Sequence, residues 1–320
     1  MKPLISRFLL VILSISFVYS PFSFAQNYPD KPIKIIVGPG PDLLARIAGE
    51  KILEDWGQSV IVDPRPAAGG IVAGDSVAKS APDGYTLLLS TGSYTINSVL
   101  QPKMPYDFQK DLTPVSLLAT LPFILVVNSS SPIKSVKELV SNAKAQSGKL
   151  NYASSGNGTP AHLAGEMLKQ MSGADITHIP YKSAAAGVTD VLGGQVNFMF
   201  VPAPSALPFI HSNQLRALAV SSPKRYSQLP DVPTVAEEGY PNFSIVGWNG
   251  INVPAKTPAS VIDKLNKEFV KIMRQKDTQE KAIAAGFEPI GSSVEEFTQF
   301  LKRDISRSSE VIKAGNIQPF

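Results

Sequence analysis

Hydrophobic residues along the chain follow two alternating patterns. Short unbroken apolar runs predict buried strands, and segments with an apolar residue at every third or fourth position predict helices. The first pair is a strand over 33–37, followed by a helix that begins at Asp42 and continues to Leu53. Repetition of a strand and then a helix is typical of α/β proteins, in which helices cover both faces of a sheet.

The same alternation continues along the chain. In the amino-terminal part, we expect strands over 60–62 and 86–90 and a helix over 71–79. A second series combines helices with short strands, namely helices over 136–146, 161–171 and 184–192 and strands over 150–153, 176–179, 198–200 and 215–220. Apolar residues at helical spacing over 261–273 and 297–305 predict that the carboxy-terminal part is helical.

Two extended segments separate the two series. Residues 114–128 form an apolar stretch that is too long, and too interrupted by proline, for one strand, so we expect a connection between lobes. Residues 243–253 are expected to cross back in extended form. The predicted architecture is therefore two βα lobes joined by two extended crossovers, with a cleft between them. The predicted boundaries are a signal peptide over 1–25, lobe 1 over 26–121 plus 247–320, and lobe 2 over 122–246.

The amino-terminus has the pattern of a secretory signal peptide. Lys2 and Arg7 precede an apolar run over 8–18, and small residues surround a cleavage position after Ala25. A membrane anchor is disfavoured because the run is shorter than the roughly 20 apolar residues that span a bilayer. The cleavage site has no cysteine, which excludes a lipid anchor. We therefore expect a periplasmic protein that is cleaved after Ala25.

Composition then narrows the function classes. The chain has 320 residues, 43% of them hydrophobic and 18% charged, and no cysteine, which excludes disordered chains, disulfide scaffolds and cysteine zinc sites. Cleavage would lower the net charge from +4 to +2, because Lys2 and Arg7 leave with the signal. No basic stripe and no second long apolar run remain, so we expect neither nucleic-acid binding nor stable membrane insertion.

Three glycine-rich loops each join the carboxyl end of a predicted strand to the start of a helix. They cover residues 38–41, 67–70 and 154–159. Helix N-termini present unpaired N–H donors and a partial positive charge, and ligands of open α/β sheets bind at the carboxyl ends of strands. Each loop alone could be only a tight turn with a self-capped helix. Three such loops facing one cleft favour a site for an anion or a polar ligand. Tyr94, Tyr181, Lys182 and Trp248 are expected beside it.

Catalytic and metal sites have little support. Residues 156–161 fit the dinucleotide pattern G-x-G-x-x-A, but Pro160 lies inside it and an exported protein does not meet a pool of NAD. The only histidines are His162, His178 and His211, without an H-E-x-x-H motif, and no pair of carboxylates stands out. A secreted serine hydrolase that uses Ser76 or Ser155 is the alternative from another class. We expect no catalytic residue, no metal and no cofactor.

Several spaced motifs resemble one family of proteins. The sequence is similar to the substrate-binding component of tripartite tricarboxylate transporters, the Bug family of periplasmic solute-binding proteins. The matching blocks cover residues 28–34, 65–70, 81–87, 150–154, 158–166, 178–182, 190–195, 215–220 and 229–239. The resemblance implies a two-lobed type II periplasmic-binding fold that closes over a small carboxylate, and delivery of that ligand to membrane permease subunits or to a signalling receptor.

The resemblance also implies a ligand site built from both lobes, in a protein that is expected to be a monomer. The implied ligand-binding residues are Gly40, Asp42, Gly69, Gly70, Ser93, Ser154, Ser155, Gly158, Thr159, His162, Tyr181 and Lys182. Two departures from the family pattern affect this site: the loop over 37–42 is shorter, and Val201-Pro202 stands where an acidic residue is frequent. The shorter loop leaves open a third function, a sensor module without a small ligand that contacts a protein partner.

Overall fold

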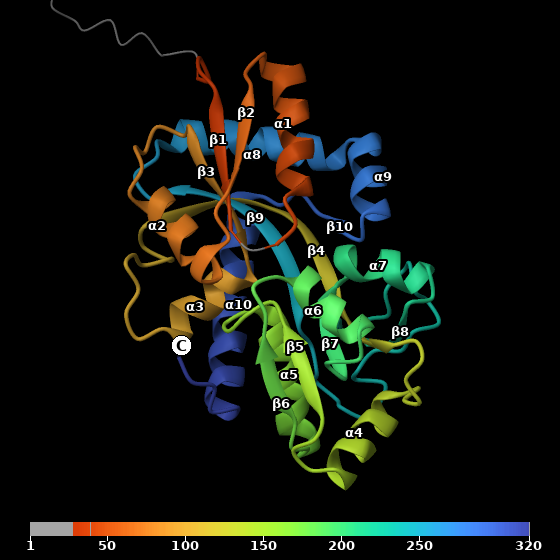
Figure 1. Cartoon of the computed structure of the whole chain (residues 1–320). Helices are drawn as coiled ribbons and strands as arrows, with labels where there is room; N and C mark the ends of the chain where they lie inside the picture. The colour runs from red at the N-terminus through yellow and green to blue at the C-terminus, as the bar shows by residue number, and fades with distance from the viewer. Residues whose placement is uncertain (1–27, 39, 320) are drawn as a thin grey trace, which may run out of the picture.

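The computed structural model describes residues 28–38 and 40–319, so the predicted signal peptide lies outside the described residues. In these residues, ten strands form one mixed sheet that is ordered β2-β1-β3-β9-β4-β7-β5-β6, with β8 and β10 paired to β4 (Figure 1). The strands are β1 Ile33–Val37, β2 Val60–Pro64, β3 Thr86–Thr91, β4 Leu112–Asn128, β5 Asn151–Ser154, β6 Thr177–Pro180, β7 Phe198–Pro202, β8 Leu215–Val220, β9 Val246–Pro254 and β10 Glu288–Pro289. The predicted α/β class is confirmed.

The sheet has two parallel parts. We call β1, β2 and β3 the first strand group and β5, β6, β7 and β8 the second strand group. Strand β1 is parallel to β2 and β3, and β5 is parallel to β6 and β7. The long strands β4 and β9 are antiparallel to their neighbours and join the two groups.

Strand β4 corrects one expectation. Residues 114–128 were expected to be a connection, but they lie within a single strand of 17 residues. Its first part pairs with β9 and its second part with β7 and β8, and register shifts at Pro114/Ser116 and Leu117/Ala119 let the strand bend. The segment does pass from one strand group to the other, as expected, but as a paired strand. Pro114 lies at the first of these shifts, where the ladder is interrupted and a residue without an N–H is tolerated.

Helices cover both faces of each part. They are α1 Leu43–Trp56, α2 Ile71–Ala78, α3 Gly92–Leu100, α4 Val136–Ala145, α5 Pro160–Ser172, α6 Ala184–Leu192, α7 Ala203–His211, α8 Ala259–Arg274, α9 Lys276–Ala284 and α10 Val294–Ala314, with a short 3₁₀ turn at Ala67–Gly70. Alternation along the strands decides which helix each residue meets. Ile35 and Val37 pack with α1 and α8, whereas Ile36 between them packs with α2 and α10.

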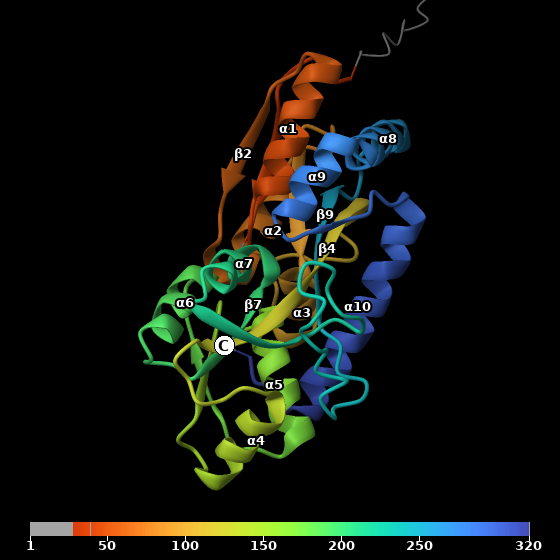
Figure 2. The same ribbon diagram turned by 90° about the vertical axis from the view of Figure 1, so that its right-hand side faces the viewer.

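Helix α10 belongs to the core of both parts. Phe297 and Leu301, near its start, are buried with residues of the first strand group. Val311 and Ile312, near its end, are buried in the cluster that contains β5 and α5. In Figures 1 and 2, α10 extends from the level of β9 to the level of α5. The helix is therefore a third link between the parts, beside β4 and β9.

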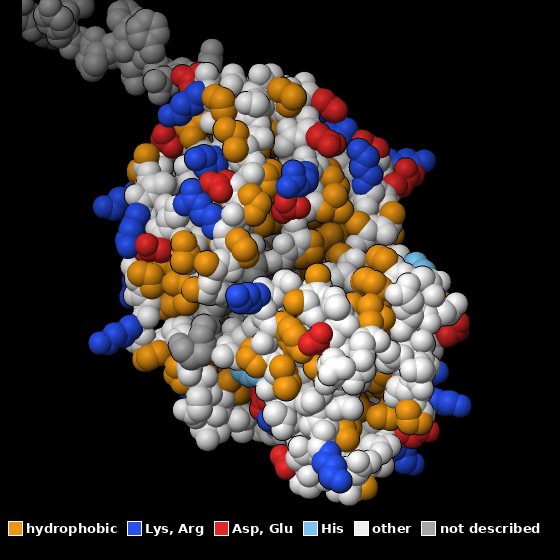
Figure 3. All heavy atoms as spheres, viewed as in Figure 1, with side chains coloured by type: hydrophobic (Ala, Val, Ile, Leu, Met, Phe, Trp, Pro, Cys, Tyr) orange, Lys and Arg blue, Asp and Glu red, His pale blue; other side chains and the backbone are white. Residues whose placement is uncertain are grey.

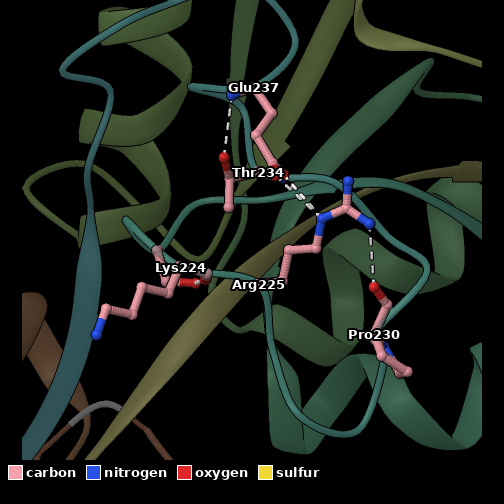
Figure 4. A network of polar contacts seen from close by, with 6 residues as sticks. Lys224, Arg225, Pro230, Thr234 and Glu237 are labelled. Atoms are coloured by element: carbon pink, nitrogen blue, oxygen red, sulfur yellow. Dashed lines mark hydrogen bonds and ion pairs between the residues drawn. The ribbon is translucent and has the colours of Figure 1, made fainter.

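The segment between β8 and β9 has no helix, as its proline, serine and charged residues predict. Side chains hold it in shape (Figure 4). Arg225 Nε donates to both carboxylate oxygens of Glu237 at 3.1 and 3.0 Å, and Arg225 Nη1 donates to the Pro230 carbonyl at 3.2 Å. The Thr234 backbone N–H donates to the Glu237 carboxylate, and the Glu237 backbone N–H donates to the Thr234 hydroxyl. The Thr234 backbone N–H and Arg225 lower the pKa of Glu237.

The surface carries both signs of charge. On the face that Figure 3 shows, lysine, arginine, aspartate and glutamate side chains are interspersed without a continuous basic stripe. Among the described helices, none combines the length and the apolar character needed to cross a bilayer.

Candidate functional site

A cavity of about 450 Å³ lies where the two strand groups face each other. The carboxyl ends of the strands of both groups meet at this cavity. Several of the residues that line it are the last residue of a strand or lie just after one. They include Gly38 after β1, Pro64 of β2, Thr91 of β3, Ser155 after β5, Lys182 after β6 and Pro202 of β7. Backbone groups at these ends have no further strand partner, so the topology by itself concentrates free donors at the cavity.

Five helices begin at this cavity. Their first residues or N-caps line it, namely Asp42 of α1, Gly92 of α3, Thr159 of α5, Ala184 of α6 and Pro202 of α7. Each helix start carries unpaired N–H groups and a partial positive charge. Five of them around one cavity favour a ligand with negative charge.

Side-chain caps occupy only some of the unpaired backbone N–H groups at these helix starts. Thr91, Thr159 and Ser183 each accept one backbone N–H, at 3.4, 3.4 and 3.2 Å. Helices α1 and α7 have no side-chain cap. The carboxylate of Asp42 accepts from Arg46 instead, with Nη2 at 2.6 Å, and so does not cap its own helix.

The cavity has few charged groups. Of the described residues that line it, only Lys182 and Asp42 are charged, and Asp42 is already paired with Arg46. Lys182 is exposed and makes no ion pair with any described residue. Within the described ranges, Lys182 is therefore the one cation of the lining without an ion pair, and it follows β6 of the second strand group.

An unpaired amide supplies a further donor. Asn249 lines the cavity from β9, its side chain is 2% exposed, and its Nδ2 has no hydrogen-bond partner in the described part of the chain. A buried donor without a partner costs free energy, so this amide is suited to a ligand acceptor. The antiparallel pairing of β9 with β3 and β4 carries Asn249 to the site, opposite Thr91 and Ala119.

The neighbouring wall of the cavity is apolar and fixed. Leu121, Phe123 and Trp248 line it. The Trp248 Nε1–H donates to Asp304 Oδ2 at 3.1 Å, and the Thr95 hydroxyl donates to the same oxygen at 2.6 Å. These bonds hold the indole in one orientation. Burial raises the pKa of Asp304 despite both hydrogen bonds.

The predicted ligand residues divide into two sets. Six of them line the cavity: Gly40, Asp42, Ser93, Ser155, Thr159 and Lys182. Six others do not line it: Gly69, Gly70, Ser154, Gly158, His162 and Tyr181. Tyr94, which was expected beside the cleft, is buried under Gly38 and lies outside the lining, whereas Trp248 is part of it.

The six residues outside the lining support the loops around it. Gly69 and Gly70 form the 3₁₀ turn, where the Gly69 carbonyl accepts from Asn97 Nδ2 at 3.2 Å. The Tyr181 hydroxyl donates to Asp190 at 2.5 Å and not toward the cavity. Ser154 and Gly158 belong to the loop that carries Ser155 but do not line the cavity, and His162 lies behind that loop.

Sequence reasoning missed several residues of the lining. Thr91 ends β3 and Gly92 begins α3, and the same strand-to-helix signal that marked the other loops could have indicated them. Ser183 and Ser205 begin α6 and α7, and α7 was not expected because Pro204 and Pro208 interrupt its pattern. Asn249 had no local signal, because only the pairing of distant strands brings it to the cavity.

Both departures from the family pattern lie at the cavity. Gly40 and Pro41 of the shortened loop line it directly, and Pro41 has no N–H to offer. Val201 is fully buried, and Pro202, which stands in the segment where an acidic residue is frequent, lines the cavity without charge.

No hydrolytic centre is assembled among the described residues. The Ser76 hydroxyl accepts from Arg65 Nη1 at 2.7 Å, and Ser155 makes no hydrogen bond with a histidine. Ser154 does lie 2.7 Å from His178 Nε2, but Ser154 is fully buried and outside the lining. Within the described ranges, no group of three His, Asp or Glu side chains is placed to hold a metal ion.

Comparison with known proteins agrees with this geometry. Residues 44–317 match the model of a family described as the tripartite tricarboxylate transporter family receptor. Three solved structures are similar. An R. palustris protein with adipate has a TM-score of 0.88 at 31% identity, over 92% of this chain and 100% of that one. The periplasmic binding protein BugD has a TM-score of 0.84 at 30% identity, over 91% and 99%. MatC from Rhodopseudomonas palustris, with bound malate, has a TM-score of 0.82 at 27% identity, over 89% and 100%.

Proposed function

This chain belongs to the tripartite tricarboxylate transporter receptor family, and on that premise we propose that it captures a small organic carboxylate in the cavity between its strand groups. Members of the family are solute-binding receptors, and BugD is a periplasmic binding protein. Export by the signal over residues 1–25 and delivery to membrane permease subunits complete the proposed role.

The unpaired amide of Asn249, buried among five helix starts, is the observation that carries the proposal. The Asn249 Nδ2 group lacks a hydrogen-bond acceptor. The helix N-termini and Lys182 around the cavity favour an acceptor that carries negative charge. A carboxylate satisfies both requirements. The adipate and malate bound to the two R. palustris proteins support the same ligand class.

The proposed contacts come from both parts of the molecule. Gly40, Ser93 and Asn249 would donate from the side of the first strand group, and Ser155, Thr159 and Lys182 from the side of the second. Closure of one part over the other would complete the contacts, with β4 and β9 as the hinge. The boundaries 26–121 plus 247–320 and 122–246 remain our proposal for the moving lobes.

Thermal unfolding against a panel of acids tests the proposal. The panel contains adipate, malate, citrate, an aromatic monocarboxylate and the matching uncharged amides. A ligand at about 100 times its Kd stabilises a protein by roughly 2.7 kcal/mol, which appears as a clear rise in Tm. We expect at least one acid to raise Tm, and its amide to have no effect. A panel without any shift would overturn the carboxylate proposal.

A variant that removes the charge of Lys182 tests whether the acid binds in this cavity. Lys182→Met should weaken binding of the acid found in the panel roughly tenfold, because it removes the unpaired cation of the cavity. Lys149→Met is the matched control, because Lys149 is also exposed but lies away from the lining. Titration calorimetry on both variants and on the unaltered protein measures the difference.

A further inference from the structure

Two stacked histidines lie directly behind the loop over residues 154–159. The rings of His162 and His178 are parallel within 16°, with centroids 4.1 Å apart, and the Tyr152 ring stacks on the other side of His178 at 4.8 Å. Both rings are bonded to the loop. The Gly158 N–H donates to His162 Nδ1 at 3.3 Å, and His178 Nε2 lies 2.7 Å from the Ser154 hydroxyl.

The loop between these two anchors carries ligand contacts. Ser155 and Thr159 line the cavity, while Ser154 and Gly158 are bonded to the histidines. Further bonds close the loop on itself: the Ser154 hydroxyl and the Thr159 hydroxyl both contact the Gly156 carbonyl, at 3.1 and 2.7 Å. The histidines thus fix the loop from its buried side.

The hydrogen bonds fix the charge state of His162. A ring nitrogen that accepts a hydrogen bond carries no proton, so the Gly158 bond requires a neutral ring with its proton on Nε2. Protonation of Nδ1 would place two N–H donors against each other and release Gly158. Two protonated rings stacked at 4.1 Å would also repel each other.

We propose that the stacked pair of His162 and His178 positions the ligand loop and does so only while the His162 ring is neutral, so that acid weakens carboxylate binding. The predicted effect on affinity rests on the proposed function, whereas the role of the histidines in positioning the loop does not. Both histidines are positioning residues, since neither lines the cavity. An aliphatic or aromatic residue could fill the same space, but it could not accept the Gly158 N–H.

Burial favours the neutral rings, although one neighbouring carboxylate opposes it. Glu166 and Lys169 face it from α5, and Tyr152 faces it from β5; the Tyr152 hydroxyl donates to Glu166 at 2.8 Å and Lys169 donates to the same carboxylate oxygen at 2.9 Å. Burial lowers the pKa of His162, against the attraction of Glu166. Burial, with the nearby His162, lowers the pKa of His178 to about 3.

The sign of the pH effect follows from these directions. The histidine pKa is lowered while the loop is ordered and returns to its ordinary value, near 6.5, when the loop is released. The neutral ring therefore stabilises the ordered loop fully at pH values above 6.5. As pH falls below 6.5, the population of molecules with a protonated histidine and a released loop increases. Affinity should therefore be constant at neutral pH and decline in acid.

Nuclear magnetic resonance tests the structural part without any ligand. In the ¹⁵N-labelled protein at pH 7.5, the long-range spectrum should show a His162 ring with its proton on Nε2 and none on Nδ1. The Gly158 amide signal should shift when the ring titrates. A ring that carries a proton on Nδ1 at pH 7.5 would overturn the proposal.

Calorimetry with adipate as the probe tests the functional part between pH 7.5 and 5.0. His162→Asn keeps an acceptor near the place of Nδ1 but does not titrate, so it should bind within about threefold of the unaltered protein at pH 7.5 and lose less affinity in acid. His162→Phe keeps the stacking and loses the acceptor, so it should bind roughly tenfold more weakly at pH 7.5. Identical pH profiles for His162→Asn and the unaltered protein would contradict the proposal.

A control separates the pair from other titrations. His211→Asn removes the third histidine, which is exposed at the end of α7, and should leave the pH profile unchanged. If adipate does not bind, the acid identified in the panel replaces it. If no acid binds, the proposed function fails, whereas the His162 ring spectrum still decides the positioning role.

Discussion

At the scale of single residues, the proposed binding and the stability of the free protein place opposite demands on Asn249. Its buried Nδ2 lacks a partner in the described residues, which costs stability in the free protein, and the same donor is available to a ligand. Asn249→Leu should therefore raise the free energy of unfolding without ligand, by about 1 kcal/mol, while it weakens acid binding roughly tenfold. Urea unfolding and titration calorimetry on the same variant measure the two effects.

Asn252 offers the matched control. It is also buried on β9 with an unpaired Nδ2, but it does not line the cavity, and its Oδ1 accepts from Ser90 at 2.6 Å. Asn252→Leu should leave acid affinity unchanged. Equal losses of affinity in the two variants would contradict the assignment of Asn249 to the ligand.

Glu268 on α8 makes stability depend on pH. Burial, together with the neighbouring Asp55 carboxyl, raises the pKa of Glu268 to about 7. The folded state then binds more protons than the unfolded state between pH 4.5 and 7, so stability falls as pH rises through this window. Glu268→Gln should stabilise the protein at pH 8 by on the order of 1–3 kcal/mol and have little effect at pH 4.5.

Urea unfolding at pH 4.5, 6 and 8 measures this difference. Glu50→Gln, at an exposed position in the middle of α1, serves as the control and should have little effect on stability at each pH. A Glu268→Gln variant with the same pH dependence as the unaltered protein would show that the carboxyl titrates in the same way in both states.

At the scale of elements, we expect the caps of helices that begin at the cavity to serve both folding and the proposed binding. The Thr159 hydroxyl accepts from the His162 N–H at the start of α5, and Thr159 also lines the cavity. Thr159→Ala should cost about 1 kcal/mol of stability and also weaken binding, because the loop loses its fixed end. Thermal unfolding with and without the acid measures both.

Helix α4 provides a cap that has no part in the site. The Ser135 hydroxyl accepts from the Glu138 N–H at 3.1 Å, and neither residue lines the cavity. Ser135→Ala should lose a similar amount of stability with unchanged affinity. A loss of affinity in this control would mean that general destabilisation, and not the site, explains the result for Thr159.

At the scale of the whole molecule, one glycine lies where the two parts touch. Gly286, between α9 and β10, has φ +95°, and a Cβ there would lie 2.8 Å from the Pro204 nitrogen at the start of α7. Gly286→Ala should push the two parts toward an open arrangement. We expect a larger radius of gyration in small-angle scattering and weaker acid binding, because closure would then strain the contact.

Gly239 controls for backbone strain. It has φ +102°, and a Cβ there would meet nothing within 4 Å. Gly239→Ala should lose a comparable amount of stability, roughly 1 kcal/mol, without a change in size or affinity. An unchanged radius and affinity in Gly286→Ala as well would contradict a role for this contact in closure.

The sequence predicted the elements with strong local patterns. The strands and helices of both βα series lie close to their expected positions because apolar periodicity and glycine-rich turns are local signals. Helix α3, rich in Ser, Thr and Asn, and helix α7, with internal Pro208, were not expected because their local preference opposes a helix. Packing against the core overrides that preference.

By itself, the sequence determined the α/β class, the family and the loops that end the parallel strands, because these depend on residues close together in the chain. Only the tertiary structure decided that β4 is one continuous strand, that α10 packs in both parts, and that Asn249 and Trp248 face the cavity. It also placed His162 behind the loop over residues 154–159, and it left both His162 and the loop residue Ser154 outside the lining. These features depend on the pairing of strands and the stacking of rings far apart in sequence, for which a local pattern carries no signal.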